Sequence, residues 1–75
     1  MTEAITGSNR KVWFNFIEDC EDNEGGYFVM VYPSPDEMSC DYFDYFCVHP
    51  EDCDCRDWDA VENYCKEYIS TITEY

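Results

Sequence analysis

Two segments in the first half of the chain have the residue pattern of β-strands. Lys11–Glu18 is rich in β-branched and aromatic residues that alternate between two faces, and Tyr27–Tyr32 has equally strong β propensity. Between them, Asp19–Gly26 is polar, and its two adjacent glycines can adopt positive φ. The pattern predicts an antiparallel hairpin with a long acidic tip.

The second half predicts one more strand and one helix. The prolines of residues 33–35 end the second strand because proline cannot donate to a ladder, and residues 34–41 form an acidic loop. Tyr42–Val48 predicts a third strand. Arg56–Glu74 predicts a helix, because apolar side chains recur there at helical spacing: Trp58, Val61, Cys65, Tyr68, Ile69 and Ile72. Asp54 or Asp57 can cap its N-terminus.

These elements predict a single α+β domain over residues 1–75. We expect a three-stranded antiparallel sheet with one C-terminal helix packed on it, in the order β-β-β-α. Residues 1–9 are polar and are expected to be loose. The large apolar residues are interpreted most simply as core: Phe14, Phe16, Phe28, Met30, Phe43 and Phe46. Some of the more amphipathic tyrosines Tyr27, Tyr32, Tyr42 and Tyr45 are expected to face outward.

Charge changes this picture of an ordinary small domain. The 75 residues contain 18 Asp and Glu against 4 Lys and Arg, a net charge of -14. Between Val12 and Cys55 there are twelve carboxylates and no lysine or arginine. A long acidic tract is typically disordered, but ten aromatic residues between Trp13 and Phe46 supply apolar surface for folding. The sequence therefore predicts a folded, nearly cation-free acidic surface.

Such a surface can imitate nucleic acid. Successive outward carboxylates on a strand lie about 7 Å apart, close to the spacing of phosphates along a DNA strand. A folded polyanion can therefore compete for a basic groove that binds nucleic acid by counterion release. The expected contact set joins the hairpin tip to the following acidic segment: Glu18, Asp19, Glu21, Asp22, Glu24, Asp36, Glu37, Asp41, Tyr42, Asp44 and Tyr45. The alternative is that these acids only keep the protein solvated, although ordinary surfaces mix both signs.

The six cysteines are best interpreted as reduced thiols. Residues 1–9 lack the apolar core of a signal peptide, and no apolar run has the length of a membrane span. The expected compartment is the cytoplasm of the cell that makes the protein, where disulfides are uncommon. Three disulfides in a secreted chain remain an alternative.

A zinc site is the second functional hypothesis. Cys47, His49, Cys53 and Cys55 supply four possible tetrahedral ligands within nine residues, but their spacing differs from that of familiar zinc knuckles. We therefore favour a cysteine-containing loop over a metal site, and predict no cofactor. The acidic loops do not match a calcium-binding pattern. One histidine, with no partner arrangement and no phosphate-binding glycine loop, gives no basis for catalysis.

In size, acidity, aromatic content and its cation-free span, the whole chain resembles small acidic inhibitors that bacterial viruses make against nucleic-acid-binding proteins. These include anti-CRISPR proteins, anti-restriction proteins and inhibitors of DNA-repair glycosylases. The resemblance is one of overall character, and no signature residue is carried over. It implies a non-enzymatic viral protein in the host cytoplasm that occupies a basic groove of a CRISPR effector or restriction enzyme. It implies no direct binding of nucleic acid.

Overall fold

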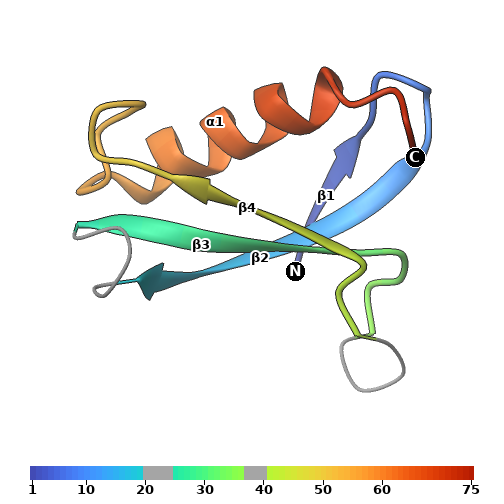
Figure 1. The fold of residues 1–75 in the computed structure, drawn as a ribbon, viewed down its shortest axis with the longest axis horizontal. Coiled ribbons are helices and arrows are strands. Elements are labelled where there is room, and N and C mark those ends of the chain that lie inside the picture. Colours follow the sequence, from blue (N-terminus) through green and yellow to red (C-terminus); the bar gives the residue numbers. More distant parts are fainter. Residues whose placement is uncertain (20–24, 37–40) are drawn as a thin grey trace.

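The chain forms a four-stranded antiparallel sheet with one helix across one of its faces (Figure 1). A computed structural model describes residues 1–19, 25–36 and 41–75. Its elements are β1 (Thr2–Ile5), β2 (Lys11–Asp19), β3 (Gly26–Tyr32), β4 (Asp44–Val48) and α1 (Trp58–Ser70). Neighbours in sequence are neighbours in the sheet, in the order β1-β2-β3-β4. The α+β class, the antiparallel sheet and the C-terminal helix are thus confirmed.

The predicted number of three strands is wrong, because residues 2–5 form an additional edge strand. β1 pairs with β2 so that Ala4 lies opposite Val12, and both side chains are buried. The backbone of α1 approaches that of β1, so this strand completes the surface on which the helix rests. The expectation that residues 1–9 are loose is therefore corrected: their order comes from pairing and from the helix, not from local propensity.

The turn between β1 and β2 is bound to the C-terminal tail. The Gly7 amide donates to the carbonyl of Ile72 at 2.8 Å, and the Ser8 hydroxyl donates to the carbonyl of Tyr75 at 2.7 Å. Within the turn, Thr6 is buried and Asn9 has a φ of 65°, a left-handed conformation that asparagine tolerates. Figure 1 shows the turn and the C-terminus side by side.

The core lies between α1 and the sheet face that it covers. The helix contributes Val61, Cys65 and Ile69, all fully buried. The sheet contributes mainly small aliphatic side chains, which fill the interface: Ala4, Val12, Phe14, Val29, Val31 and Val48. The helix is shorter than predicted at both ends. Asp57 caps its N-terminus, its side chain accepting a bond from the Asp59 amide, and Thr71 is the C-terminal cap, its amide donating to the carbonyl of Tyr68.

Several residues expected in the core lie elsewhere. Phe14 is buried, and Phe16 and Phe46 pack against the core, as expected. Phe28 and Met30, however, belong to the opposite sheet face, because Val29 and Val31 take the positions that face the helix. Phe43 precedes β4, which begins at Asp44 instead of Tyr42, and remains 41% exposed. Trp58, at the first helical position, is 68% exposed.

The contact between the β1–β2 turn and the tail gives a stability prediction. A Cβ at Gly7 would lie 2.8 Å from the carbonyl oxygen of Ser70 and 3.0 Å from Cγ2 of Thr73. Because the nearest obstacle is backbone, Gly7→Ala should destabilise the fold by about 1–3 kcal/mol, as overpacking does. Urea unfolding of both proteins measures this difference.

Ser8→Ala is the matched control in the same turn. Its hydroxyl bonds to the exposed carbonyl of Tyr75 and to the hydroxyl of Thr6 at 2.8 Å. Thr6 keeps its bond from the Arg10 amide, so the expected cost is about 0.5–1 kcal/mol. Equal stability of Gly7→Ala and the unmodified chain would show that the turn does not pack on the tail as described.

Candidate interaction surface

The end of the sheet beside the β2–β3 connection meets the loop that precedes the helix. A Cβ on Gly25 would lie 3.3 Å from Cγ of Pro50, so the start of β3 contacts this loop. The Tyr27 hydroxyl donates to the carbonyl of Cys55 at 3.2 Å, a second link between the two segments. Carboxylates from the end of β2, the loop and the first turn of α1 thereby share one end of the molecule.

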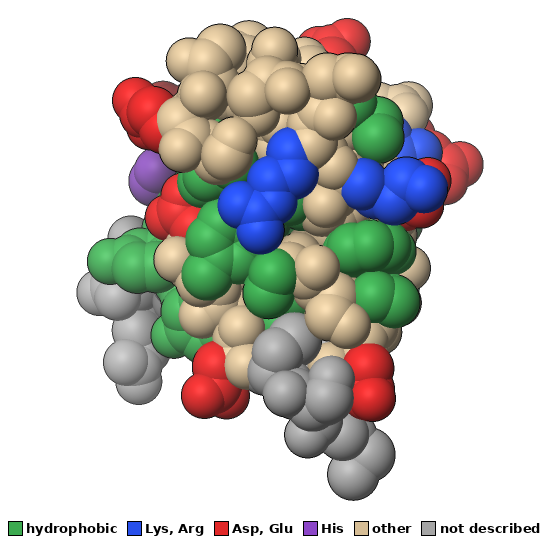
Figure 2. Space-filling model, turned by 90° about the vertical axis from the view of Figure 1, so that its right-hand side faces the viewer, with side chains coloured by type: hydrophobic (Ala, Val, Ile, Leu, Met, Phe, Trp, Pro, Cys, Tyr) green, Lys and Arg blue, Asp and Glu red, His purple; other side chains and the backbone are tan. Residues whose placement is uncertain are grey.

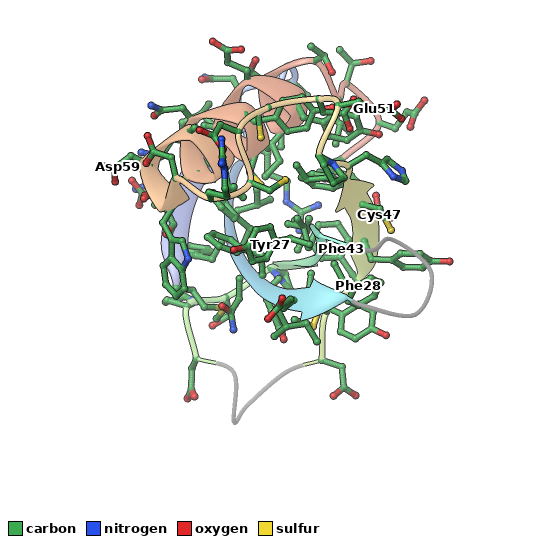
Figure 3. The ribbon with its side chains drawn as sticks, turned by 90° about the vertical axis from the view of Figure 1, so that its left-hand side faces the viewer. Tyr27, Phe28, Phe43, Cys47, Glu51 and Asp59 are labelled. Atoms are coloured by element: carbon green, nitrogen blue, oxygen red, sulfur yellow. The ribbon has the colours of Figure 1, made fainter. Side chains whose placement is uncertain are left out.

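We name this group the acidic end and define it by its described side chains. Figure 3 looks onto this end, where Glu51 and Asp59 lie at the outer edge of the molecule, on the loop and on the helix. All of its side chains belong to exposed residues: Glu18, Glu51, Asp52, Asp54, Asp57 and Asp59. Asp19 ends β2 at the same place.

Carboxylates also hold the loop of the acidic end in shape. Asp52 accepts a hydrogen bond from the His49 amide at 3.0 Å, and Asp54 accepts one from the Arg56 amide at 3.1 Å. At the start of α1, the capping Asp57 accepts one from the Asp59 amide at 3.0 Å. The amide of Arg56, and then its side chain, lower the pKa of Asp54. Each bond fixes the direction of a charged group, so these carboxylates are preorganised by the backbone.

Positive charge is concentrated away from the acidic end. Lys11 pairs with Glu3 at 3.4 Å, and Lys66 pairs with Glu62 at 3.7 Å on the helix. Arg10 lies over the ring of Phe43, 5.4 Å from its centroid. Figure 2 shows lysine and arginine side chains on the side of the molecule opposite the end seen in Figure 3. Among the described residues, the acidic end itself contains one cation, Arg56. Its Nε lies 3.3 Å from Oδ1 of Asp54.

The structure divides the contact set that the sequence predicted. Glu18 and Asp19 lie where β2 ends, whereas Asp36 and Asp41 belong to the connection at the other end of β3, and Asp44 begins β4 there. Gly26 pairs with Asp19 and Val31 pairs with Asp44, so about 17 Å of strand separates the two groups. The rest of the predicted acids lie outside the described residues: Glu21, Asp22, Glu24 and Glu37.

Asp44 has a structural partner. Its carboxylate accepts bonds from the Tyr75 hydroxyl and, at 2.8 Å, from the Tyr45 amide. Burial, followed by this bond to Asp44, raises the pKa of Tyr75. Asp44 is also half-buried, whereas Asp36 and Asp41 are exposed. Asp44 therefore helps to hold the C-terminal tail on the sheet.

The sheet face opposite α1 carries a cluster of rings. We name it the aromatic face and define it by Phe28, Tyr32, Tyr42 and Tyr45. Tyr42 lies 6.2 Å from both Phe28 and Tyr32 and 6.4 Å from Tyr45, between ring centroids. Tyr45 is 59% exposed and Tyr42 is 44% exposed, which confirms that some of the tyrosines face outward. Tyr32 is buried, and Tyr27 is half-buried on the helix side.

The possible zinc ligands do not form a metal site. Among the described residues, no three His, Cys, Asp or Glu side chains are grouped so that they could hold a metal ion. Cys47 lies on β4 at the edge of the sheet, whereas Cys53 and Cys55 belong to the loop between β4 and α1. Cys47, Cys53, Cys55 and Cys65 are free thiols. Cys20 and Cys40, and most of the acidic tip considered for calcium, lie outside the described residues.

Comparison with known proteins finds no match for this chain, whether among protein-family models, curated proteins or solved structures. No helix in the described part of the chain is long and apolar enough to cross a bilayer. Across the same residues the surface has no pocket. The function is therefore inferred from the charge and the exposed side chains of the surface.

Sequence reasoning missed the contribution of residues 51–59 to the acidic end. Its contact set joined the hairpin tip to residues 36–45, which follow it in sequence. The contacts of Gly25 with Pro50 and of Tyr27 with Cys55 span more than twenty residues, and no local pattern encodes them. The available signal was the run of aspartates before the helix, which the sequence indicated only as possible caps.

The thiols of the core give a prediction that depends on pH. Burial raises the pKa of Cys65 from 9.0 to about 12, and burial and the neighbouring Cys55 raise that of Cys53 to about 11. Both should be protonated at pH 8, and only the thiolate attacks alkylating reagents. Iodoacetamide should therefore modify Cys65 at least about tenfold more slowly in the folded chain than in urea, measured by peptide mass mapping.

The rate at Cys53 and Cys65 should rise as the pH approaches their raised pKa values. The urea-unfolded chain, with ordinary thiols, is the control at each pH. Equal rates in the folded and unfolded chains at pH 8 would contradict the burial of Cys65.

Proposed function

We propose that this protein is a non-enzymatic inhibitor that binds the basic nucleic-acid-binding surface of a host defence effector. The effectors that we consider first are CRISPR effectors, followed by restriction enzymes, in the cytoplasm of the host cell. The protein acts as a nucleic-acid mimic and does not bind nucleic acid itself. The observation that carries the proposal is the acidic end, where exposed carboxylates from β2, the loop and α1 share one end of the molecule with one arginine, which is paired with Asp54.

The order of this end favours binding over mere solvation. Solvating charges need no fixed direction, but Asp52, Asp54 and Asp57 are each bonded to a backbone amide. A basic groove normally binds phosphates and gains affinity by releasing their condensed counterions. Carboxylates that are already held in place lose little conformational entropy when they bind the lysines and arginines of such a groove.

The separation of the two acidic groups fits a groove made for an extended polyanion. About 17 Å of strand lies between the acidic end and the connection that carries Asp36 and Asp41. This length corresponds to the rise of about five base pairs along the axis of a DNA duplex, at about 3.4 Å each. We therefore propose that the two acidic groups of the predicted contact set bind two separate parts of one basic groove.

Charge reversal at the acidic end tests the proposal. Glu18 and Glu51 are exposed and make no backbone cap, so Glu18→Lys/Glu51→Lys should preserve the fold. The assay measures displacement of fluorescent duplex DNA from purified CRISPR and restriction effectors. We expect the unmodified chain to displace DNA from at least one effector. The double variant should need at least about tenfold more protein, a loss of about 1.4 kcal/mol.

Glu67→Lys/Glu74→Lys is the matched control. It changes the net charge by the same amount at exposed positions on the helix and the tail, away from the acidic end. Equal losses in both double variants would mean that net charge, and not the acidic end, determines binding. Failure of the unmodified chain to displace DNA from every effector tested would overturn the proposed function.

A further inference from the structure

One face of the sheet is covered by α1, while the other exposes aromatic rings to solvent. Tyr45 and Tyr42 of the aromatic face are 59% and 44% exposed, and Ile17 beside it is 53% exposed. Ile17 pairs with Phe28 across β2 and β3, so the apolar surface is continuous with the cluster. Rings that are neither buried in a core nor polar enough to favour water are typical of binding surfaces.

The charge of the molecule restricts what can cover this face. A second copy would bring another -14 charge against the first, and nucleic acid would likewise add a polyanion. Like charges placed against each other across an interface oppose association. A positively charged partner surface instead gains from the field of the whole molecule while it covers the rings. Charge complementarity therefore favours a cationic occupant.

Among cations, arginine matches exposed rings better than lysine does. The guanidinium group is planar and weakly hydrated and stacks on aromatic faces, whereas the ammonium group of lysine is strongly hydrated. This chain already contains such a contact, because Arg10 lies 5.4 Å from the centroid of the Phe43 ring. That contact lies outside the aromatic face, but it is an arginine–aromatic contact of the kind described above.

The ring geometry leaves aromatic surface for this contact. Tyr42 meets Phe28, Tyr32 and Tyr45 at interplanar angles of 85°, 81° and 87°. Edge-to-face neighbours hold the ring of Tyr42 upright, and its exposure shows that part of its surface reaches solvent. The rings fix one another, so an incoming guanidinium meets a preorganised site.

We propose that the aromatic face binds arginine side chains of a basic protein surface. The inference rests on the proposed function in naming that surface as part of the same effector. The acidic end supplies attraction to any cation, and the aromatic face adds selectivity for arginine over lysine. Tyr42 and Tyr45, which the sequence placed in the contact set, thereby provide selectivity for arginine, whereas the acids provide charge attraction.

Two peptides of equal length and charge, one of arginine and one of lysine, test this selectivity by calorimetry. The unmodified chain should bind the arginine peptide at least about fivefold more tightly, as expected for two exposed cation–π contacts. Tyr42→Leu/Tyr45→Leu keeps apolar side chains but removes the rings, so the two affinities should become equal. Tyr42→Phe/Tyr45→Phe keeps the rings and should keep the preference. Circular dichroism confirms that each variant is folded.

The charge variant separates this proposal from the proposed function. Glu18→Lys/Glu51→Lys should weaken both peptides by the same factor and leave the arginine preference intact. Equal binding of the two peptides by the unmodified chain would overturn the aromatic-face proposal, even if the protein displaces DNA from an effector. A preference that survives the leucine substitutions would overturn it as well. So would a dimer in sedimentation that those substitutions abolish, since a second copy would then cover the face.

Discussion

The packing of α1 on a small aliphatic sheet face is the interaction on which the rest of the structure depends. Within residues 1–19, 25–36 and 41–75, the largest fully buried side chains belong to this one interface, from Phe14 on β2 to Ile69 on α1. Each such side chain contributes on the order of 1.5–3 kcal/mol when it is buried. A net charge of -14 opposes the compact state through self-repulsion. The charged surface can therefore exist only because this interface, together with the strand pairing, holds the chain folded against that repulsion.

The parts of the fold that could be predicted from sequence are those with a local pattern. The two strands of the hairpin and the helix were found because alternation and helical spacing are properties of neighbouring residues, and Asp57 caps the helix as one of two candidates. β1 could not be found in this way. Of its four residues only Ala4 is buried, and its stability comes from pairing with β2 and from the approach of α1.

The aromatic residues show where the pattern fails. β3 is apolar at almost every position, so alternation cannot say which of its two faces is buried. Size suggested that Phe28 and Met30 belong to the core, but the structure buries Val29 and Val31 instead. Valine fits closely between a helix and a sheet, and the choice sends the larger side chains to the face opposite α1. The aromatic face is thus a consequence of how the core was filled, not a separate feature of the sequence.

The candidate site was predictable in kind but not in shape. Acidity and the scarcity of cations are visible in composition, whereas the joining of Glu18 to residues 51–59 depends on tertiary contacts at Gly25 and Tyr27.

Several acids at the acidic end both carry charge and stabilise the local backbone. Asp52, Asp54 and Asp57 bind backbone amides that the loop and the helix would otherwise leave to water, so their charge is part of the local fold. Concentrating carboxylates at one end raises the repulsion there, and these bonds offset part of it. An acidic surface built in this way keeps its geometry before any partner arrives, which is the property that a mimic of a rigid polyanion requires.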